Sequence, residues 1–268
     1  MEPESPRPLP SGFKGVPIRF LLPNLITLLA LCSGLTAIRL AFEGRFEIAV
    51  GAVILAIFLD AVDGRLARML KGTSRFGAEL DSLADFLNFG VAPALLLYFW
   101  ALNSMKPMGW TICLMLAIAC ALRLARFNVM LEDPDKPAWA GAFFTGIPAP
   151  AGAGLAMMPL YLGFLNGDTE GHAHTFLIAP LVVLIAIMLV SRIPTFSGKT
   201  VSRVPRDMVL PILAGAALAI VCLITYPWQT LLVAAVAYVV LIPLSVYRYF
   251  SYKKIDKKRI AAEQNTNA

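Results

Sequence analysis

Long apolar runs separated by short polar segments fill most of the chain. A helix needs about 20 apolar residues to cross the roughly 30 Å hydrocarbon core of a bilayer, and about eight segments meet this requirement. They are residues 22–42, 46–70, 79–101, 108–129, 143–165, 175–192, 208–225 and 229–250. The pattern therefore predicts an all-α fold, a polytopic transmembrane helical bundle of about eight spans.

Prolines interrupt the fifth of these segments. Pro148, Pro150 and Pro159 fall within it, together with several glycines. Membrane helices tolerate such breaks where neighbouring helices satisfy the freed backbone groups. The fifth and sixth spans are therefore the pair that the pattern defines least well.

The composition agrees with a location among membrane lipids. Hydrophobic residues make up 58% of the 268 residues and charged residues only 15%, which is more apolar than a soluble domain of this size requires. The four cysteines all lie in apolar runs, where a thiol packs as a small hydrophobic group. We therefore expect neither a disulfide framework nor a zinc site.

The basic residues indicate which side of the membrane is cytoplasmic. The net charge is +6, but Lys and Arg gather at the ends of apolar segments without the aromatic residues of a nucleic-acid groove, so we expect no nucleic acid partner. All but three of the 23 basic residues fall on the face that both termini share, and the exceptions are Arg39, Arg45 and Lys106. Because Lys and Arg accumulate in cytoplasmic loops, both termini are predicted to be cytoplasmic.

Four aspartates form the most informative group of polar residues. Asp60 and Asp63 are three residues apart in the second predicted span, and Asp81 and Asp85 are four apart in the third. Each pair shares one helix face, and the short connecting loop lets the two faces converge near the cytoplasmic surface. One charge at the centre of a membrane helix costs about 2.5–3.5 kcal/mol, so four converging carboxylates require compensating positive charge.

A ligand set made only of oxygen atoms favours hard cations, Mg²⁺ or Mn²⁺. Two such ions about 4 Å apart would suit phosphoryl transfer, because they neutralise phosphate oxygens and stabilise the leaving group. Gly64 and Gly77 would let a nucleotide or a neighbouring helix approach the backbone closely. Arg68 would offer its planar guanidinium to a phosphate.

Two other interpretations of the aspartates remain open from the residues alone. The carboxylates could be solvated at helix ends or paired with nearby basic residues such as Arg65, Lys71 and Arg75. They could also line the pathway of a cation or proton transporter. Their position toward one surface, rather than at the membrane midplane, favours an enzyme over a transporter.

The pattern Asp-x2-Asp-Gly-x2-Ala-Arg-x8-Gly-x3-Asp-x3-Asp, which starts at residue 60, resembles the signature of the CDP-alcohol phosphatidyltransferase family at all eight fixed positions. The resemblance implies that all four aspartates bind a two-metal centre and that Asp85 is also the general base. The residues implied to contact the CDP moiety are Gly64, Arg68, Ser74 and Gly77, with Pro23, Asn24 and Thr27 at the start of the first helix.

Residues 82–93, 122–128 and 146–151 resemble the membrane-embedded bacterial type of phosphatidylserine synthase within that family. This implies phosphatidyl transfer from CDP-diacylglycerol to L-serine at the cytoplasmic face of a bacterial cytoplasmic (inner) membrane. Arg123 and Arg126 could steer the pyrophosphate or the serine carboxylate, or could anchor the fourth span. A basic pocket that includes residues 199 or 203 would instead favour glycerol 3-phosphate or another phosphorylated alcohol as acceptor.

The expected chemistry is a direct displacement, in which the serine hydroxyl attacks the phosphorus that carries diacylglycerol and CMP leaves. Runs of small residues at 152–154 and 215–217 permit close helix packing, so a homodimer is also predicted. The predicted regions are a disordered cytoplasmic N-terminus (1–15), a catalytic membrane domain with a CDP-alcohol phosphotransferase-like core (16–206), an additional C-terminal transmembrane helix pair (207–250) and a basic cytoplasmic tail (251–268).

Overall fold

The computed structural model describes residues 18–70, 72, 74–131, 143–167, 171, 175–196 and 206–266. The predicted N-terminal lead and the basic positions 199 and 203 lie outside the described residues. Within the described part, the chain is almost wholly helical, as the apolar pattern predicted.

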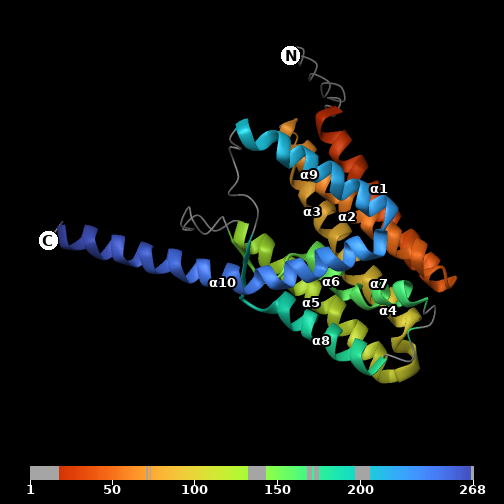
Figure 1. Ribbon diagram of the computed structural model, residues 1–268. Helices are drawn as coiled ribbons and strands as arrows, with labels where there is room; N and C mark the ends of the chain where they lie inside the picture. The colour runs from red at the N-terminus through yellow and green to blue at the C-terminus, as the bar shows by residue number, and fades with distance from the viewer. Residues whose placement is uncertain are drawn as a thin grey trace, which may run out of the picture.

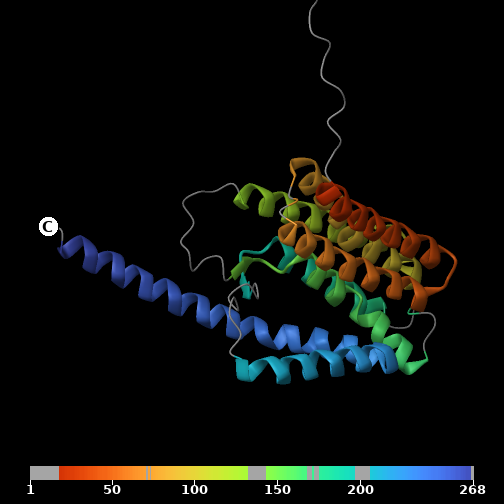
Figure 2. The ribbon, with the colours of Figure 1, turned by 90° about the horizontal axis from the view of Figure 1, so that it is seen from above.

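The first two helices form an antiparallel hairpin. α1 (Ile18–Phe42) and α2 (Phe46–Met69) lie side by side (Figures 1 and 2). Gly44 allows the tight turn between them, because its φ of 76° is a conformation that suits glycine. Small side chains such as Ala37 and Ala49 are buried in the bundle. In lipid, where apolar burial does not drive helix association, close packing of small residues holds such a pair together.

The third predicted span consists of three helical parts in direct succession. α3 (Arg75–Asp85) continues through a π-helical turn, η1 (Phe86–Val91), into α4 (Ala92–Trp100). A π-helical turn adds a residue to the helix and shifts the following side chains around its axis, which is why such turns are frequent at functional sites. This one begins directly after Asp85.

Prolines break the fifth predicted span into separate pieces. β1 (Phe143–Thr145) is followed by two short helices, α6 (Ala149–Ala156) and α7 (Met158–Asn166). Pro159 lies at the start of α7, where its missing N–H and its ring prevent α6 from continuing. The sixth predicted span is α8 (Thr175–Val190).

A short two-stranded sheet, which the apolar pattern did not predict, links two connecting segments. β1 pairs with β2 (Pro194–Phe196) in an antiparallel register that sets Phe144 opposite Thr195. Gly146 follows β1 with a φ of 79°, and a Cβ there would lie only 2.8 Å from the carbonyl oxygen of Leu189. This turn therefore requires glycine.

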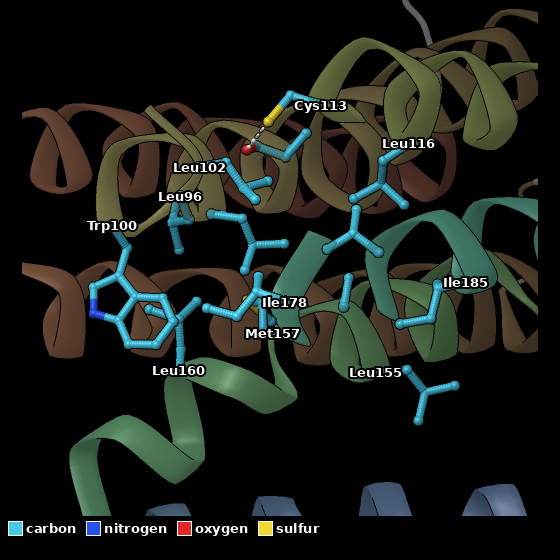
Figure 3. Packing of buried hydrophobic residues seen from close by; sticks show 14 of the residues in the cluster. Leu96, Trp100, Leu102, Cys113, Leu116, Leu155, Met157, Leu160, Ile178 and Ile185 are labelled. Atoms are coloured by element: carbon cyan, nitrogen blue, oxygen red, sulfur yellow. Dashed lines mark hydrogen bonds between the residues drawn. The ribbon is translucent and has the colours of Figure 1, made fainter. Parts of the chain in front are cut away.

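The main apolar core lies among the middle helices. A 3₁₀ turn, η2 (Leu102–Met105), leads from α4 into α5 (Pro107–Leu131), which packs against α8. Figure 3 shows Leu116 of α5, Leu160 of α7 and Ile178 of α8 among the side chains of this core. These side chains are almost completely buried, so this core fixes α5, α7 and α8 relative to one another.

α9 (Arg206–Thr225) and α10 (Pro227–Thr266) form the predicted C-terminal pair. α10 packs against α7 and β2, whereas the described side chains of α9 are exposed along nearly its whole length and suit contact with lipid. α10 then continues away from the bundle to the C-terminal end (Figure 1). The basic segment predicted as a tail is thus helical as far as Thr266, because Lys, Arg, Ala, Glu and Gln are good helix formers.

The described helices make the chain a membrane protein. Five helices are long and apolar enough to cross a membrane, and α8 is apolar but shorter. The five are Leu21–Phe42, Arg75–Trp100, Pro107–Met130, Asp207–Thr225 and Pro227–Tyr252. The count of about eight spans stays a prediction.

Gly34 of α1 makes room for Asn88 of η1, which is only 1% exposed, because a Cβ at Gly34 would overlap the asparagine side chain. We expect Gly34→Ala to lower the thermal unfolding midpoint in detergent by several degrees, since overpacking costs about 1–3 kcal/mol. The Asn88 amide has no hydrogen-bond partner among the described residues, so its removal costs little. The double variant Gly34→Ala/Asn88→Ala should therefore regain most of the loss, and a double variant less stable than Gly34→Ala would contradict this account.

Candidate active site

A cavity of about 310 Å³ lies between the first turns of α1, the end of α2 and the start of α3. It is lined by Pro23, Asn24, Thr27, Asp63, Gly64, Ala67, Arg68, Gly72, Ser74, Gly77, Ala78 and Asp81. The seven residues expected from α1 and the α2–α3 region to contact the CDP moiety are all among them. Arg68 is the basic residue of this lining, so it could contact a phosphate group.

Three carboxylates gather beside this cavity. Oxygen atoms of Asp60, Asp63 and Asp81 all lie within 4.8 Å of one another. Asp63 and Asp81 line the cavity, while the carboxyl group of Asp60 faces that of Asp85. Several hard oxygen donors this close together fit a divalent cation such as Mg²⁺ or Mn²⁺ and repel one another without it. The cluster could therefore hold a divalent metal ion.

A hydrogen bond from α1 fixes the orientation of Asp63. The hydroxyl of Thr27 donates to Oδ2 of Asp63 at 2.6 Å, and both residues are buried. The sequence predicted Thr27 as a contact of the nucleotide. The structure adds that Thr27 positions a candidate metal ligand, a link that no spacing along the sequence could indicate.

The surroundings of Gly64 in α2 and Gly77 in α3 explain why glycine occupies these two positions. A Cβ at Gly77 would lie 2.7 Å from Oδ1 of Asn24, so glycine lets α1 approach α3. Ser74 stabilises the start of α3, because its hydroxyl accepts a hydrogen bond from the Gly77 N–H at 3.0 Å. At Gly64, by contrast, a Cβ would meet no atom within 4 Å. The bare backbone at Gly64 therefore leaves room for a ligand in the cavity.

Arg123 of α5 lies near the carboxyl groups of Asp60 and Asp85 and does not line the cavity. Only 8% of Arg123 is exposed, and its guanidinium carbon lies 5.4 Å from the ring centroid of Phe127. The aromatic face helps to orient the guanidinium group. Its positive charge offsets part of the repulsion among the carboxylates, which is the compensation that the four aspartates require.

Arg126 has a different position, although the same candidate role was predicted for it as for Arg123. Its Nη1 donates to the carbonyl oxygens of Val190 at 2.7 Å and Ser191 at 3.2 Å. These carbonyls lie at the end of α8, where no further helical turn supplies a donor. Arg126 therefore joins α5 to the end of α8, and it does not line the cavity.

One further contact near the site involves residues that the sequence did not connect. The side-chain amide of Asn128 donates to the hydroxyl of Ser82 at 3.0 Å, so α5 is tied to α3 one residue after Asp81. Both residues lie in the strings that carry the family resemblance. Their pairing across 46 positions of the chain was not predictable from either string.

The chain is similar to known proteins over most of its length. The family model described as CDP-alcohol phosphatidyltransferase matches residues 20–191, and a second, CDP-alcohol phosphatidyltransferase 2, matches residues 207–243. The chain is 40% identical over 240 residues to the CDP-diacylglycerol–serine O-phosphatidyltransferase of Mycobacterium tuberculosis, covering 88% of this chain and 82% of that protein.

Two more distant relatives extend the comparison. The Helicobacter pylori protein with the same name is 37% identical over 178 residues, covering 65% of this chain and 71% of the relative. The archaetidylserine synthase of Methanothermobacter thermautotrophicus is 32% identical over 185 residues, covering 67% and 73% of the two chains. From the matched residues and the relatives together, this chain belongs to the CDP-alcohol phosphatidyltransferase family.

Proposed function

We propose that this chain is a CDP-diacylglycerol–serine O-phosphatidyltransferase, which moves the phosphatidyl group of CDP-diacylglycerol onto the hydroxyl of L-serine and releases CMP. The observation that carries the proposal is the place of the carboxylate cluster. Asp63 and Asp81 line a cavity with the residues expected for the nucleotide, and Asp60 and Asp85 lie near the buried cation of Arg123. Relatives of that name at 37–40% identity support serine as the acceptor.

The CDP moiety would occupy the cavity between α1, α2 and α3. Gly64 leaves space beside the backbone, and the Arg68 guanidinium would contact the pyrophosphate. Two Mg²⁺ or Mn²⁺ ions held by the four aspartates would supply charge neutralisation at the phosphate oxygens and stabilise the leaving CMP. Thr27 would keep the Asp63 carboxylate oriented toward this site through its 2.6 Å hydrogen bond.

Asp85 would accept the proton of the serine hydroxyl. One of its carboxylate oxygens is buried and has no hydrogen-bond partner among the described residues. Asp85 also lies outside the compact group of three carboxylates, which supports a looser hold on metal and hence a basic oxygen. As that proton moves to Asp85, the serine oxygen forms a bond to the phosphorus bearing diacylglycerol, and the bond from that phosphorus to the oxygen of CMP breaks.

The test is release of CMP from CDP-diacylglycerol by the protein purified in detergent. Reactions with Mn²⁺ or Mg²⁺ would contain L-serine, glycerol 3-phosphate, inositol phosphate or no acceptor. We expect release that depends on L-serine and stops when a chelator is added. Release with glycerol 3-phosphate alone would keep the family and overturn the acceptor, and no release with any acceptor would overturn the proposed activity.

The orientation in the bacterial inner membrane is also part of the proposal: both termini and the active site would face the cytoplasm, as the basic residues predict. Glu43 and Arg75 are exposed and lie at opposite ends of the α2 region. In a variant without native cysteines, a membrane-impermeant maleimide should label Glu43→Cys in intact spheroplasts and Arg75→Cys only after permeabilisation. The reverse labelling order would contradict this orientation.

The predicted homodimer stays a prediction, but the structure distinguishes the two small-residue runs. A Cβ at Gly152 would lie 2.7 Å from Leu189, so this glycine serves packing within the chain. A Cβ at Gly215 on the exposed helix α9 would meet no atom within 4 Å. The run on α9 is therefore free for contact with a second copy, whereas in the run at 152–154 open space is found beside Gly154 but not beside Gly152.

A further inference from the structure

Arg123 is a buried cation whose hydrogen-bonding capacity is unused. Among the described residues, no carboxylate oxygen is close enough to form an ion pair with it, and no acceptor takes a hydrogen bond from its guanidinium. A guanidinium carries five N–H donors, and those of Arg123 are open to a ligand because no described residue accepts a hydrogen bond from them. Electrostatic attraction to Asp60 and Asp85 helps to stabilise the charged guanidinium in the interior, but it does not provide hydrogen-bond acceptors for the N–H groups. The free donors are therefore available to bind an anionic group.

Tyr238 of α10 presents a second unpaired group beside Arg123. Its hydroxyl is buried, has no hydrogen-bond partner among the described residues, and lies close to Arg123 and Thr195. Thr195 belongs to β2 and already donates its own hydroxyl hydrogen to the carbonyl oxygen of Gly146 at 2.7 Å. The Thr195 oxygen could still accept a hydrogen bond from Tyr238, but the structure forms no hydrogen bond between these two hydroxyls. The phenolic O–H of Tyr238 remains available as a donor.

Arg123 and Tyr238 do not line the nucleotide cavity. Asp63 and Asp81 line the cavity, whereas Asp60 and Asp85 are the two carboxylates that Arg123 attracts. In phosphoryl transfer the attacking and leaving oxygens are roughly in line on either side of the phosphorus. An acceptor beside Arg123 and Asp85 would thus approach the phosphorus from the side away from CMP.

We propose that Tyr238 and Arg123 together bind the carboxylate of the acceptor amino acid, so that α10 contributes to the acceptor site. This inference rests on the proposed function. The acceptor carboxylate would take hydrogen bonds from the guanidinium and from the phenolic hydroxyl, while its side-chain hydroxyl would face the unpaired oxygen of Asp85. Tyr238 would then select for an acceptor with a carboxylate, which assigns a function to the C-terminal helix pair.

The experiment compares L-serine with serinol, in which a hydroxymethyl group replaces the carboxylate. Tyr238→Phe removes only the hydroxyl and keeps the ring in its packing. We expect it to raise the KM for L-serine about tenfold, because a hydrogen bond to a charged group is lost. The KM for CDP-diacylglycerol should not change, and the preference for L-serine over serinol in kcat/KM should fall by the same factor as the KM rises.

Tyr161→Phe is the matched control. Tyr161 of α7 is 1% exposed and its hydroxyl also has no hydrogen-bond partner among the described residues, but it does not contact the site. This variant should keep the wild-type KM and acceptor preference. A purely structural effect of Tyr238→Phe would lower activity with both acceptors equally and leave the preference unchanged.

The outcomes separate this inference from the proposed function. If the wild-type protein shows no serine-dependent release of CMP, the proposed function fails and the inference fails with it. If the wild-type protein is active and Tyr238→Phe keeps both the KM for L-serine and the preference over serinol, only the inference fails. A raised KM with reduced preference, absent in Tyr161→Phe, supports the assignment of Tyr238.

Discussion

Replacing Asp81 with asparagine is expected to reduce kcat by about 10²–10³-fold and to raise the Mn²⁺ concentration required for half-maximal activity. The oxygen atoms of Asp81, Asp60 and Asp63 lie within 4.8 Å of one another, so losing one negative charge weakens the whole ligand set. Asparagine has nearly the same shape, so the change is mainly one of charge. The measurement is CMP release across a titration of Mn²⁺.

Glu79→Gln provides the control for Asp81→Asn. Glu79 lies on the same helix and is exposed, so removing its charge should leave both kcat and the metal requirement unchanged. An Asp81→Asn variant with wild-type turnover and wild-type metal dependence would show that Asp81 is not a ligand. The candidate metal centre would then need a different set of residues.

Asp85→Asn is expected to reduce kcat by about 10²–10⁴-fold, the loss typical for removal of a general base. Unlike Asp81→Asn, it should change the half-saturating metal concentration only slightly, because the compact group of three carboxylates remains intact. Binding of CDP should also be retained, since Asp85 does not line the nucleotide cavity. Kinetic assays and a metal titration on the same preparation separate these effects.

Other results with Asp85→Asn would assign Asp85 a different role from that of general base. A large loss of metal affinity would make Asp85 chiefly a ligand, and the proton would then need another acceptor. Near-normal turnover with metal still bound would exclude Asp85 as the base. Because Asp60 faces Asp85, Asp60→Asn belongs in the same series: it should show the weakened metal affinity that Asp85→Asn lacks.

The helices and the convergence of the aspartate pairs could be predicted because their signals are local. A run of apolar residues is itself the requirement for a membrane helix, so the limits of α1, α2 and α5 follow the pattern within a few residues. The two aspartate pairs have helical spacing on elements joined by a short loop. Their convergence therefore follows from helix geometry and a short connection.

The remaining features depend on contacts between distant parts of the chain. β1 and β2 have three residues each, too few for an alternating pattern, and they pair across about fifty positions. Arg123 and Arg126 are three residues apart on α5, yet one lies near Asp85 and the other binds carbonyls at the end of α8. Their different roles depend on which helices surround α5.

Tyr238 shows the limit of sequence patterns most clearly. It lies in an apolar run on α10 without any recognisable motif, and a tyrosine in such a run predicts only packing or contact with the membrane interface. Its relation to Arg123 arises because α10 packs across β2, an element that was itself not predicted. Only the packed structure brings these two residues together.

The most direct test of the central claim follows the oxygen atom of the acceptor. The purified protein would be given CDP-diacylglycerol, Mn²⁺ and L-serine labelled with ¹⁸O in its side-chain hydroxyl, and the products would be analysed by mass spectrometry. Direct displacement predicts phosphatidylserine that carries the label and CMP that does not. A lipid product without the label, label in CMP, or no phosphatidylserine at all would contradict the proposed transfer.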